Sequence, residues 1–244
     1  MAIKNIFKKI FSKEAPKVKE TSSSPKLEEI KKKWMQDPTV KEWDQKGWLK
    51  EENQDVLDYL FTEWEKRGEL IPPVHRIKSN AIAEYGKKYN YDILVETGTY
   101  LGKMIDAQKD NFKRIISIEI DKKFHEDAIE KFKNDKHISF YLGDSGKLLH
   151  DIVKILDKPA IFWLDAHYNS RSSAKLDKDC PIFEELDAIF KANNPGHVLL
   201  VDDARLFIGK NDYPTIPELE NYVKAKRPEY KMEVKNDIIR FAIN

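Results

Sequence analysis

The sequence predicts an α/β fold: a doubly wound, mostly parallel seven-stranded sheet with a C-terminal antiparallel hairpin and an N-terminal helical extension. Short apolar runs alternate with helical patterns along residues 70–226. This alternation is typical of parallel strands joined by right-handed helical crossovers. Two further strand-like runs flank Asn236-Asp237, and both residue types tolerate the positive φ angles of a tight turn.

Local signals support the individual elements. Ser79 can cap the first helix of the main domain, and Pro181 suits the first turn of a later helix, with Asp179 as its cap. The expected helices are 79–89, 99–111, 122–134, 145–156, 181–192 and 216–226. The expected strands are the apolar, β-branched and aromatic runs 93–96, 115–120, 138–142, 160–165, 197–201, 230–235 and 238–243.

The N-terminal region differs from the rest of the chain in charge. Residues 1–35 carry a net charge of +6, whereas the remainder carries −5. Apolar and Lys residues alternate at helical spacing over residues 3–11, which predicts a basic amphipathic helix. We expect either a weak contact with an anionic membrane surface through residues 1–13, or a disordered or protein-bound tail. The expected divisions are 1–25 (basic segment and flexible linker), 26–69 (helical cap) and 70–244 (main domain).

Composition limits the class of protein. With 41% hydrophobic and 35% charged residues, the chain is typical of soluble globular proteins, and no apolar run approaches the ~20 residues of a membrane span. A single cysteine, Cys180, and no secretory signal favour a cytoplasmic location, with peripheral contact at the inner membrane face. The acidic body disfavours nucleic acid as a partner. The oligomeric state stays open, with a homodimer among the options.

Three features at successive strand ends predict a nucleoside-binding site. Glu96-Thr97-Gly98-Thr99-Tyr100-Leu101-Gly102 joins the first strand to a helix, where open α/β sheets bind ligands. Glu119 ends the second strand, and a carboxylate there can accept hydrogen bonds from both hydroxyls of a ribose. Asp144 and Ser145 follow the third strand. A structural turn and ordinary polar strand ends are the alternative explanation of each feature taken alone.

The residues at these positions resemble those of a known family. Glu96–Gly102, Glu119, Asp165 and Asp202-Asp203 are similar to the catechol O-methyltransferase-like branch of class I S-adenosylmethionine-dependent methyltransferases. Two longer segments resemble a bacterial group associated with surface-glycan or sugar modification: Phe162-Trp163-Leu164-Asp165-Ala166-His167-Tyr168, and Val201–Phe207 with the following Tyr213-Pro214. The resemblance covers about residues 70–244. It implies a Rossmann-like methyltransferase fold with a terminal hairpin.

The resemblance also implies which residues bind the cofactor. S-adenosylmethionine would contact the glycine loop, Glu119 at the ribose, the segment after the third strand near the adenine, and Asp165. The implied set is Glu96, Thr97, Gly98, Thr99, Tyr100, Gly102, Glu119, Asp144, Ser145 and Asp165.

A divalent metal site is a second implication of the resemblance. Asp165, Asp202 and Asp203 would bind Mg²⁺ or a similar cation, which would lower the pKa of an acceptor hydroxyl. A solvated strand end is the alternative role for Asp202-Asp203.

The general base is less determined by the sequence. Catechol-type enzymes carry a Lys three residues after the fourth-strand Asp, whereas this chain has Tyr168 there. His167 is therefore the candidate base, beside Asp165, with a structural His as its alternative role. Arg205 and Arg171 are candidates to bind the acceptor. His75 and Lys78 are further candidates to face the site.

The sequence thus predicts an O-methyltransferase that uses S-adenosylmethionine and Mg²⁺ on a hydroxyl of a small molecule, sugar or glycan. The alternatives are a metal-independent methyltransferase of another acceptor and a non-enzymatic Rossmann-like binding protein. A nicotinamide-dependent dehydrogenase is disfavoured, because the sheet of such an enzyme is not expected to end in an antiparallel hairpin.

Overall fold

The computed structural model describes residues 32, 36, 38–46, 75–165, 180–192 and 196–243. The expected basic helix and linker of residues 1–25 and most of the helical cap lie outside these ranges, as do His167, Tyr168 and Arg171. The chain divides into two compact units, 1–77 and 78–244. In the first unit the structure describes helix α3 (Pro38–Gln45) and the beginning of α5. Among the described helices, none has the length and apolar content needed to cross a membrane.

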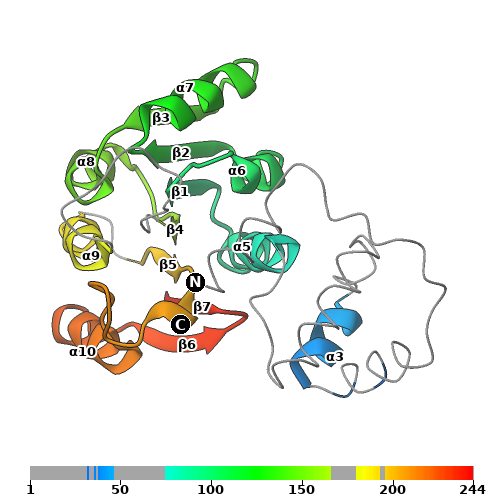
Figure 1. The fold of residues 1–244 in the computed structure, drawn as a ribbon, viewed down its shortest axis with the longest axis vertical. Coiled ribbons are helices and arrows are strands. Elements are labelled where there is room, and N and C mark those ends of the chain that lie inside the picture. The colour runs from blue at the N-terminus through cyan, green and yellow to red at the C-terminus, as the bar shows by residue number, and fades with distance from the viewer. Residues whose placement is uncertain are drawn as a thin grey trace. The chain divides into compact units, whose positions relative to one another are not determined.

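The second unit alternates strands and helices, as the sequence predicts (Figure 1). The strands are β1 (Ile93–Thr97), β2 (Arg114–Glu119), β3 (Ile138–Leu142), β4 (Ile161–Leu164), β5 (Val198–Val201), β6 (Lys231–Lys235) and β7 (Ile238–Ala242). The helices are α5 (His75–Tyr89), α6 (Lys103–Gln108), α7 (Lys122–Lys131), α8 (Ser145–Ile152), α9 (Ile182–Phe190) and α10 (Ile216–Lys226), with short 3₁₀ turns η1 (Val153–Ile155) and η2 (Ala204–Leu206).

The seven strands form one sheet in the order β3-β2-β1-β4-β5-β7-β6. The first five strands pair in parallel, and β7 runs antiparallel to both β5 and β6. This is the expected doubly wound sheet, closed by the hairpin at Asn236-Asp237. Both turn residues have positive φ angles, 56° and 59°.

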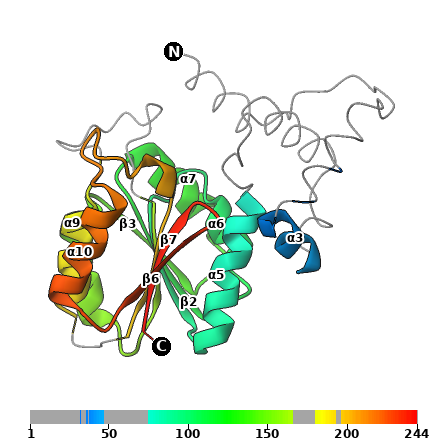
Figure 2. The same cartoon turned by 90° about the horizontal axis from the view of Figure 1, so that it is seen from below.

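Apolar residues cover both faces of the sheet. Successive strand residues point to opposite faces, so Val95 joins the core beneath α8, α9 and α10, while Leu94 joins the core beneath α5 and α6. Figures 1 and 2 show these helices on the two sides of the sheet. Burial on both faces explains why β1, β4 and β5 are almost continuously apolar.

The topology places the site. The carboxyl ends of the five parallel strands meet at one edge of the sheet. Because β7 is antiparallel to β5, the β6–β7 turn returns to that same edge, where the Ala204 backbone N–H donates to the Asp237 carbonyl at 2.9 Å. Side chains from the strand ends, the following loops and this turn therefore meet there.

Helix α6 begins later than predicted. The sequence favours a helix from Thr99, but the structure begins it at Lys103. Tyr100 and Gly102 have φ angles of 47° and 64°, and such left-handed residues do not fit a right-handed helix. The residues before Lys103 form a loop instead. Helix α5 begins earlier than predicted, so Ser79 lies inside it rather than at its cap.

Candidate functional site

The loop after β1 is shaped by backbone geometry. Gly98 has a φ of 86° and donates its N–H to the Ile118 carbonyl at 2.9 Å. At Gly102 a Cβ atom would lie 2.7 Å from the Phe132 ring, so a side chain would clash as well as being strained. Both glycines are needed for a tight loop between β1 and α6. The loop leaves main-chain groups at the carboxyl edge of the sheet, the position at which open α/β sheets bind ligands.

Glu119 is held by this loop. Its Oε2 accepts the Tyr100 backbone N–H at 2.7 Å, and its Oε1 accepts the Asp121 backbone N–H at 2.8 Å. Burial raises the pKa of Glu119, and these backbone hydrogen bonds oppose the rise. The Ile120 backbone N–H is a third donor to this carboxylate. A carboxylate has about four lone-pair sites, so Glu119 keeps the capacity to accept a further hydrogen bond, as from a ribose hydroxyl.

Glu96 lies beneath the loop and is 1% exposed. The Ser117 hydroxyl donates to its Oε2 at 2.5 Å, and Ser117 also bonds to Thr99 at 2.6 Å between the two hydroxyl oxygens. Burial raises the pKa of Glu96 to about 8, and the charge of Asp165 adds to that shift. Glu96 is therefore mostly protonated at neutral pH. Ser117, which the sequence analysis did not single out, connects Glu96 to the loop.

The remaining predicted cofactor residues have structural contacts of their own. Asp144 caps α8 by accepting the Gly146 backbone N–H at 3.0 Å, and Ser145 is the buried first residue of that helix. Thr97 is fully buried, and its hydroxyl accepts the Asp165 backbone N–H at 3.2 Å. These contacts fix the strand ends. The direct role of Asp144 at the adenine stays a prediction.

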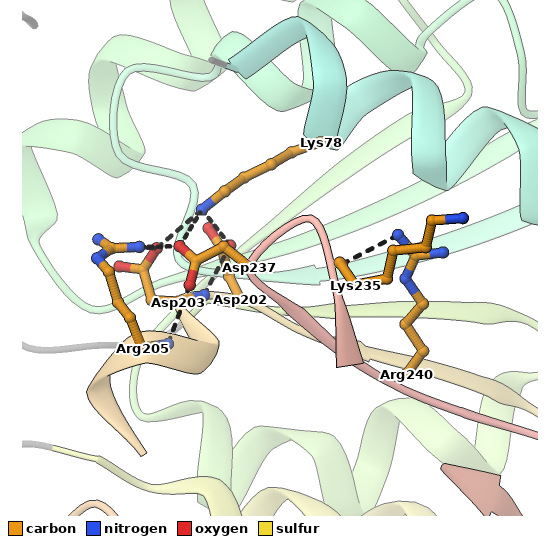
Figure 3. Close-up of polar contacts among 7 residues, drawn as sticks. All are labelled: Lys78, Asp202, Asp203, Arg205, Lys235, Asp237 and Arg240. Atoms are coloured by element: carbon orange, nitrogen blue, oxygen red, sulfur yellow. Dashed lines mark hydrogen bonds and ion pairs between the residues drawn. The ribbon is translucent and has the colours of Figure 1, made fainter. Parts of the chain in front are cut away.

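A cluster of charged side chains lies at the ends of β5 and the β6–β7 turn (Figure 3). Asp202 and Asp203 follow β5, and Asp237 comes from the turn. One carboxylate oxygen from each lies within 4.8 Å of the others. The sequence did not predict Asp237 as a member of this cluster, because Asn236-Asp237 was interpreted only as the turn of a hairpin.

Asp165 lies at the neighbouring strand end. The Asp202 backbone N–H donates to the Leu164 carbonyl at 3.0 Å, so the two strand ends are in register. Burial raises the pKa of Asp202, the Lys78 ammonium opposes that rise, and the nearby charges of Asp203 and Asp165 add to it. Its carboxylate is nevertheless outside the three-aspartate group of the described residues. The predicted Asp165–Asp202–Asp203 metal set stays a prediction.

Two cations complete the cluster. The Lys78 ammonium, from α5, bonds to Asp202 and, at 2.8 Å, to Asp203, with Asp237 at 3.6 Å. The Arg205 guanidinium bonds to Asp203 at 2.8 Å and also to Asp237. Arg205 thus lies in this cluster, where its contacts are with carboxylates, and its predicted role at the acceptor stays a prediction.

These cations bear on the metal implied by the resemblance. Three carboxylate oxygens suit Mg²⁺ by their chemistry. However, N–H donors of Lys78 and Arg205 already bond to all three aspartates. A cation bound between these oxygens would have to displace the Lys78 ammonium. The residues as arranged therefore do not fit a divalent ion.

Comparison with known proteins identifies the fold. No family model matches the chain, and no curated protein matches it. Solved structures do match. A proposed caffeoyl-CoA O-methyltransferase from Staphylococcus aureus aligns over 84% of this chain and 99% of its own, with 13% identity and a TM-score of 0.52.

Two further structures contain cofactor or product. The O-methyltransferase TomG from Streptomyces achromogenes, involved in tomaymycin synthesis and in complex with S-adenosylmethionine (SAM), aligns over 79% of this chain and 92% of its own, with 14% identity and a TM-score of 0.51. An O-methyltransferase from Bacillus cereus in complex with S-adenosylhomocysteine (SAH) gives the same coverages, 13% identity and a TM-score of 0.51.

The chain has the Rossmann-like fold of these methyltransferases. At these identities the likeness describes the fold, including the antiparallel β7 between β5 and β6. The predicted fold class is therefore confirmed. The narrower resemblance to catechol- or glycan-associated enzymes stays a prediction.

Proposed function

We propose that this chain is an S-adenosylmethionine-dependent O-methyltransferase that acts on a hydroxyl of a small molecule or sugar. The observation that carries the proposal is Glu119, buried at the end of β2 and held by two backbone N–H groups, one of them from the β1–α6 loop. Glu119 lies at the carboxyl edge of the parallel strands, where open α/β sheets bind ligands, and this position supports a role at the ribose. The O-methyltransferases of matching fold support the choice of an oxygen acceptor.

The proposed chemistry is a direct transfer. S-adenosylmethionine, when bound, supplies an electrophilic methyl group on a sulfonium. The chain holds the ribose through Glu119 and the main-chain loop at Gly98, and it presents Asp202, Asp203 and Arg205 beside the acceptor. His167 remains the proposed acceptor of the hydroxyl proton. Holding donor and acceptor in line is the main source of rate in such a site.

The proposed transfer does not depend on a divalent metal. The resemblance implies Mg²⁺, but Lys78 and Arg205 already neutralise most of the carboxylate charge. A sugar or glycan hydroxyl is the acceptor that the resemblance favours. Transfer of labelled methyl groups from S-adenosylmethionine to a panel of sugars and catechols, with and without chelator, addresses both points.

Calorimetric titration with S-adenosylmethionine and S-adenosylhomocysteine tests cofactor binding. We expect both ligands to bind the wild-type chain, and Glu119→Ala to weaken binding about tenfold to a hundredfold, because hydrogen bonds to a charged group are worth about 1.5–3 kcal/mol. Glu130→Ala, at an exposed position of α7, is the matched control and should bind like wild type. Equal affinity of Glu119→Ala and wild type would remove Glu119 from the ribose site.

The non-enzymatic alternative makes a different prediction. A Rossmann-like binding protein would bind the cofactor but transfer no methyl group to any acceptor in the panel. Cofactor binding without turnover would favour that alternative, whereas the absence of binding would exclude both.

A further inference from the structure

The ammonium of Lys78 lies inside the aspartate cluster. Figure 3 shows the side chain reaching from α5 toward the ends of β5 and the β6–β7 turn, where Arg205 lies beside the same carboxylates. Lys78 contacts all three aspartates, and its side chain is 10% exposed. The Lys78 ammonium, carried by helix α5, is thus surrounded by carboxylates from the end of β5 and from the β6–β7 turn.

The charges within the cluster nearly balance. Three aspartates face one lysine and one arginine, which leaves a single negative charge when all five groups are ionised. The Lys78 ammonium bonds to Asp202 and Asp203 and lies 3.6 Å from Asp237, so its positive charge faces all three carboxylates.

The position of the ammonium is one that a metal ion would need. Mg²⁺ binds carboxylate oxygens at about 2.0–2.1 Å, so an ion between these oxygens would lie within the space of the Lys78 nitrogen, which is 2.8 Å from Asp203. Without Lys78 the cluster would carry two negative charges in excess. A divalent cation is favoured by this excess negative charge and by three carboxylate oxygens that lie close together.

We infer that Lys78 is the resident cation of this site, replacing a divalent metal, and that methyl transfer by this chain needs no metal. The second clause rests on the proposed function, whereas the first concerns the cluster alone. Lys78 acts as a positioning residue: it holds Asp202 and Asp203 and places a positive charge where an acceptor oxygen becomes negative. Arg205 adds a second fixed charge through Asp203 and Asp237.

The inference predicts that removing the lysine charge creates a metal site. The experiment is calorimetric titration of Mn²⁺ into the full chain for wild type, Lys78→Met and Lys87→Met, a matched substitution at an exposed position of the same helix. In wild type and in Lys87→Met we expect no Mn²⁺ to bind at Asp202. In Lys78→Met we expect Mn²⁺ to bind with a submillimolar Kd. The double variant, which combines Lys78→Met with Asp202→Asn, should lose that binding.

A purely structural role of Lys78 gives a different pattern. In that case Lys78→Met would lower stability without gaining metal affinity. Thermal melting with and without Mn²⁺ separates the two, because a metal that binds only the folded state raises Tm. We expect Mn²⁺ to raise the Tm of Lys78→Met and to leave wild type unchanged.

Two results would overturn the inference. One is Mn²⁺ binding by wild type that Asp202→Asn abolishes. The other is a folded Lys78→Met, or the gentler Lys78→Gln, that binds no Mn²⁺. If neither variant folds, the wild-type titration still tests the inference, because Mn²⁺ binding at Asp202 in wild type would contradict it. A parallel titration of S-adenosylmethionine in the presence of chelator distinguishes the two proposals. If S-adenosylmethionine does not bind, the proposed function is wrong, whereas the conclusion about Lys78 and the metal is unaffected.

Discussion

His197 illustrates how a single buried residue can set a pH dependence. Its Nδ1 accepts the Ala160 backbone N–H at 3.0 Å, and its ring packs edge-on against Phe162 at 5.0 Å between ring centres. Its Nε2 is buried, with no hydrogen-bond partner among the described residues. Burial lowers the pKa of His197 to about 4, and the charge of Arg227 adds to that shift. Between pH 4 and 6.5, His197 is therefore mostly neutral in the folded chain and mostly protonated in the unfolded chain.

The sign of the effect follows from that difference. Below a pH of about 6.5 the unfolded chain gains a proton that folded His197 refuses until about 4, so stability falls with decreasing pH by about 1.4 kcal/mol per unit in that window. We expect His197→Asn, whose amide oxygen can still accept the Ala160 N–H, to flatten this part of the profile. Urea unfolding at pH 4.5, 5.5 and 6.5 measures it. An unchanged slope relative to wild type would show that His197 is not the group responsible.

At the residue level, strand-end position singled out Glu96 and Glu119, and the family resemblance singled out Asp202 and Asp203. The structure places all four at the carboxyl edge of the parallel strands. Asp237 was missed as a site residue, since Asn-Asp in a hairpin is sufficiently explained by the turn. Its carboxylate reaches the cluster only because β7 lies beside β5, a long-range pairing that local sequence does not encode.

Helix termini show the same contrast at the level of elements. Helix α10 matches its predicted bounds, because Thr215 and Glu218 form a capping box that local sequence specifies. The predicted start of α6 was wrong. The residues after Thr99 form a loop instead of a helix, because Tyr100 has a left-handed conformation and its backbone N–H is held by Glu119. Local motifs predict an element boundary well when the contacts that fix it are themselves local.

The capping box permits a test at this level. The Thr215 hydroxyl accepts the Glu218 backbone N–H at 3.3 Å, and Glu218 accepts the Thr215 backbone N–H at 2.7 Å. We expect Thr215→Ala to lower the free energy of unfolding by about 1 kcal/mol, and Thr215→Ser to keep most of it, because serine preserves the hydroxyl. Chemical denaturation of both variants provides the measurement. Equal losses in the two would mean that the methyl group, not the hydroxyl, matters.

For the whole molecule, the alternation of strands and helices was enough to predict the fold class. Right-handed crossovers allow few arrangements, and the terminal hairpin separates this sheet from other doubly wound sheets. The relation of the N-terminal region to the main domain could not be predicted. Charge and periodicity describe residues 1–69 locally, and neither specifies which surface a helix packs against.

The pH profile of the whole domain combines two buried groups of opposite sign. Glu96, with a pKa of about 8 in the folded chain, keeps a proton that the unfolded chain loses near 4.5, so its effect is to lower stability as pH rises from 4.5 to 8. His197 opposes this trend below about 6.5. Of these two groups, only Glu96 contributes above pH 6.5, and its contribution amounts to about 2 kcal/mol by pH 8.

We therefore expect wild type without cofactor to lose stability between pH 6.5 and 8, and Glu96→Gln, which does not titrate, to lose much less. Glu130→Gln, at an exposed position, is the control and should follow wild type. Guanidinium unfolding at four pH values across this range gives the comparison. Parallel decline in Glu96→Gln and wild type would assign the effect to another group.

The direction of the last strand has a practical consequence. Because the β6–β7 turn lies at the carboxyl edge of the parallel strands, β7 carries the chain away from that edge, and Phe241 pairs with Leu199 near the beginning of β5 (Figure 2). A fluorophore, affinity tag or surface linker attached after residue 243 would thus leave from the opposite rim of the sheet. Protein immobilised in this way would present the edge proposed to bind the cofactor away from the support, which suits tests of the proposed acceptors.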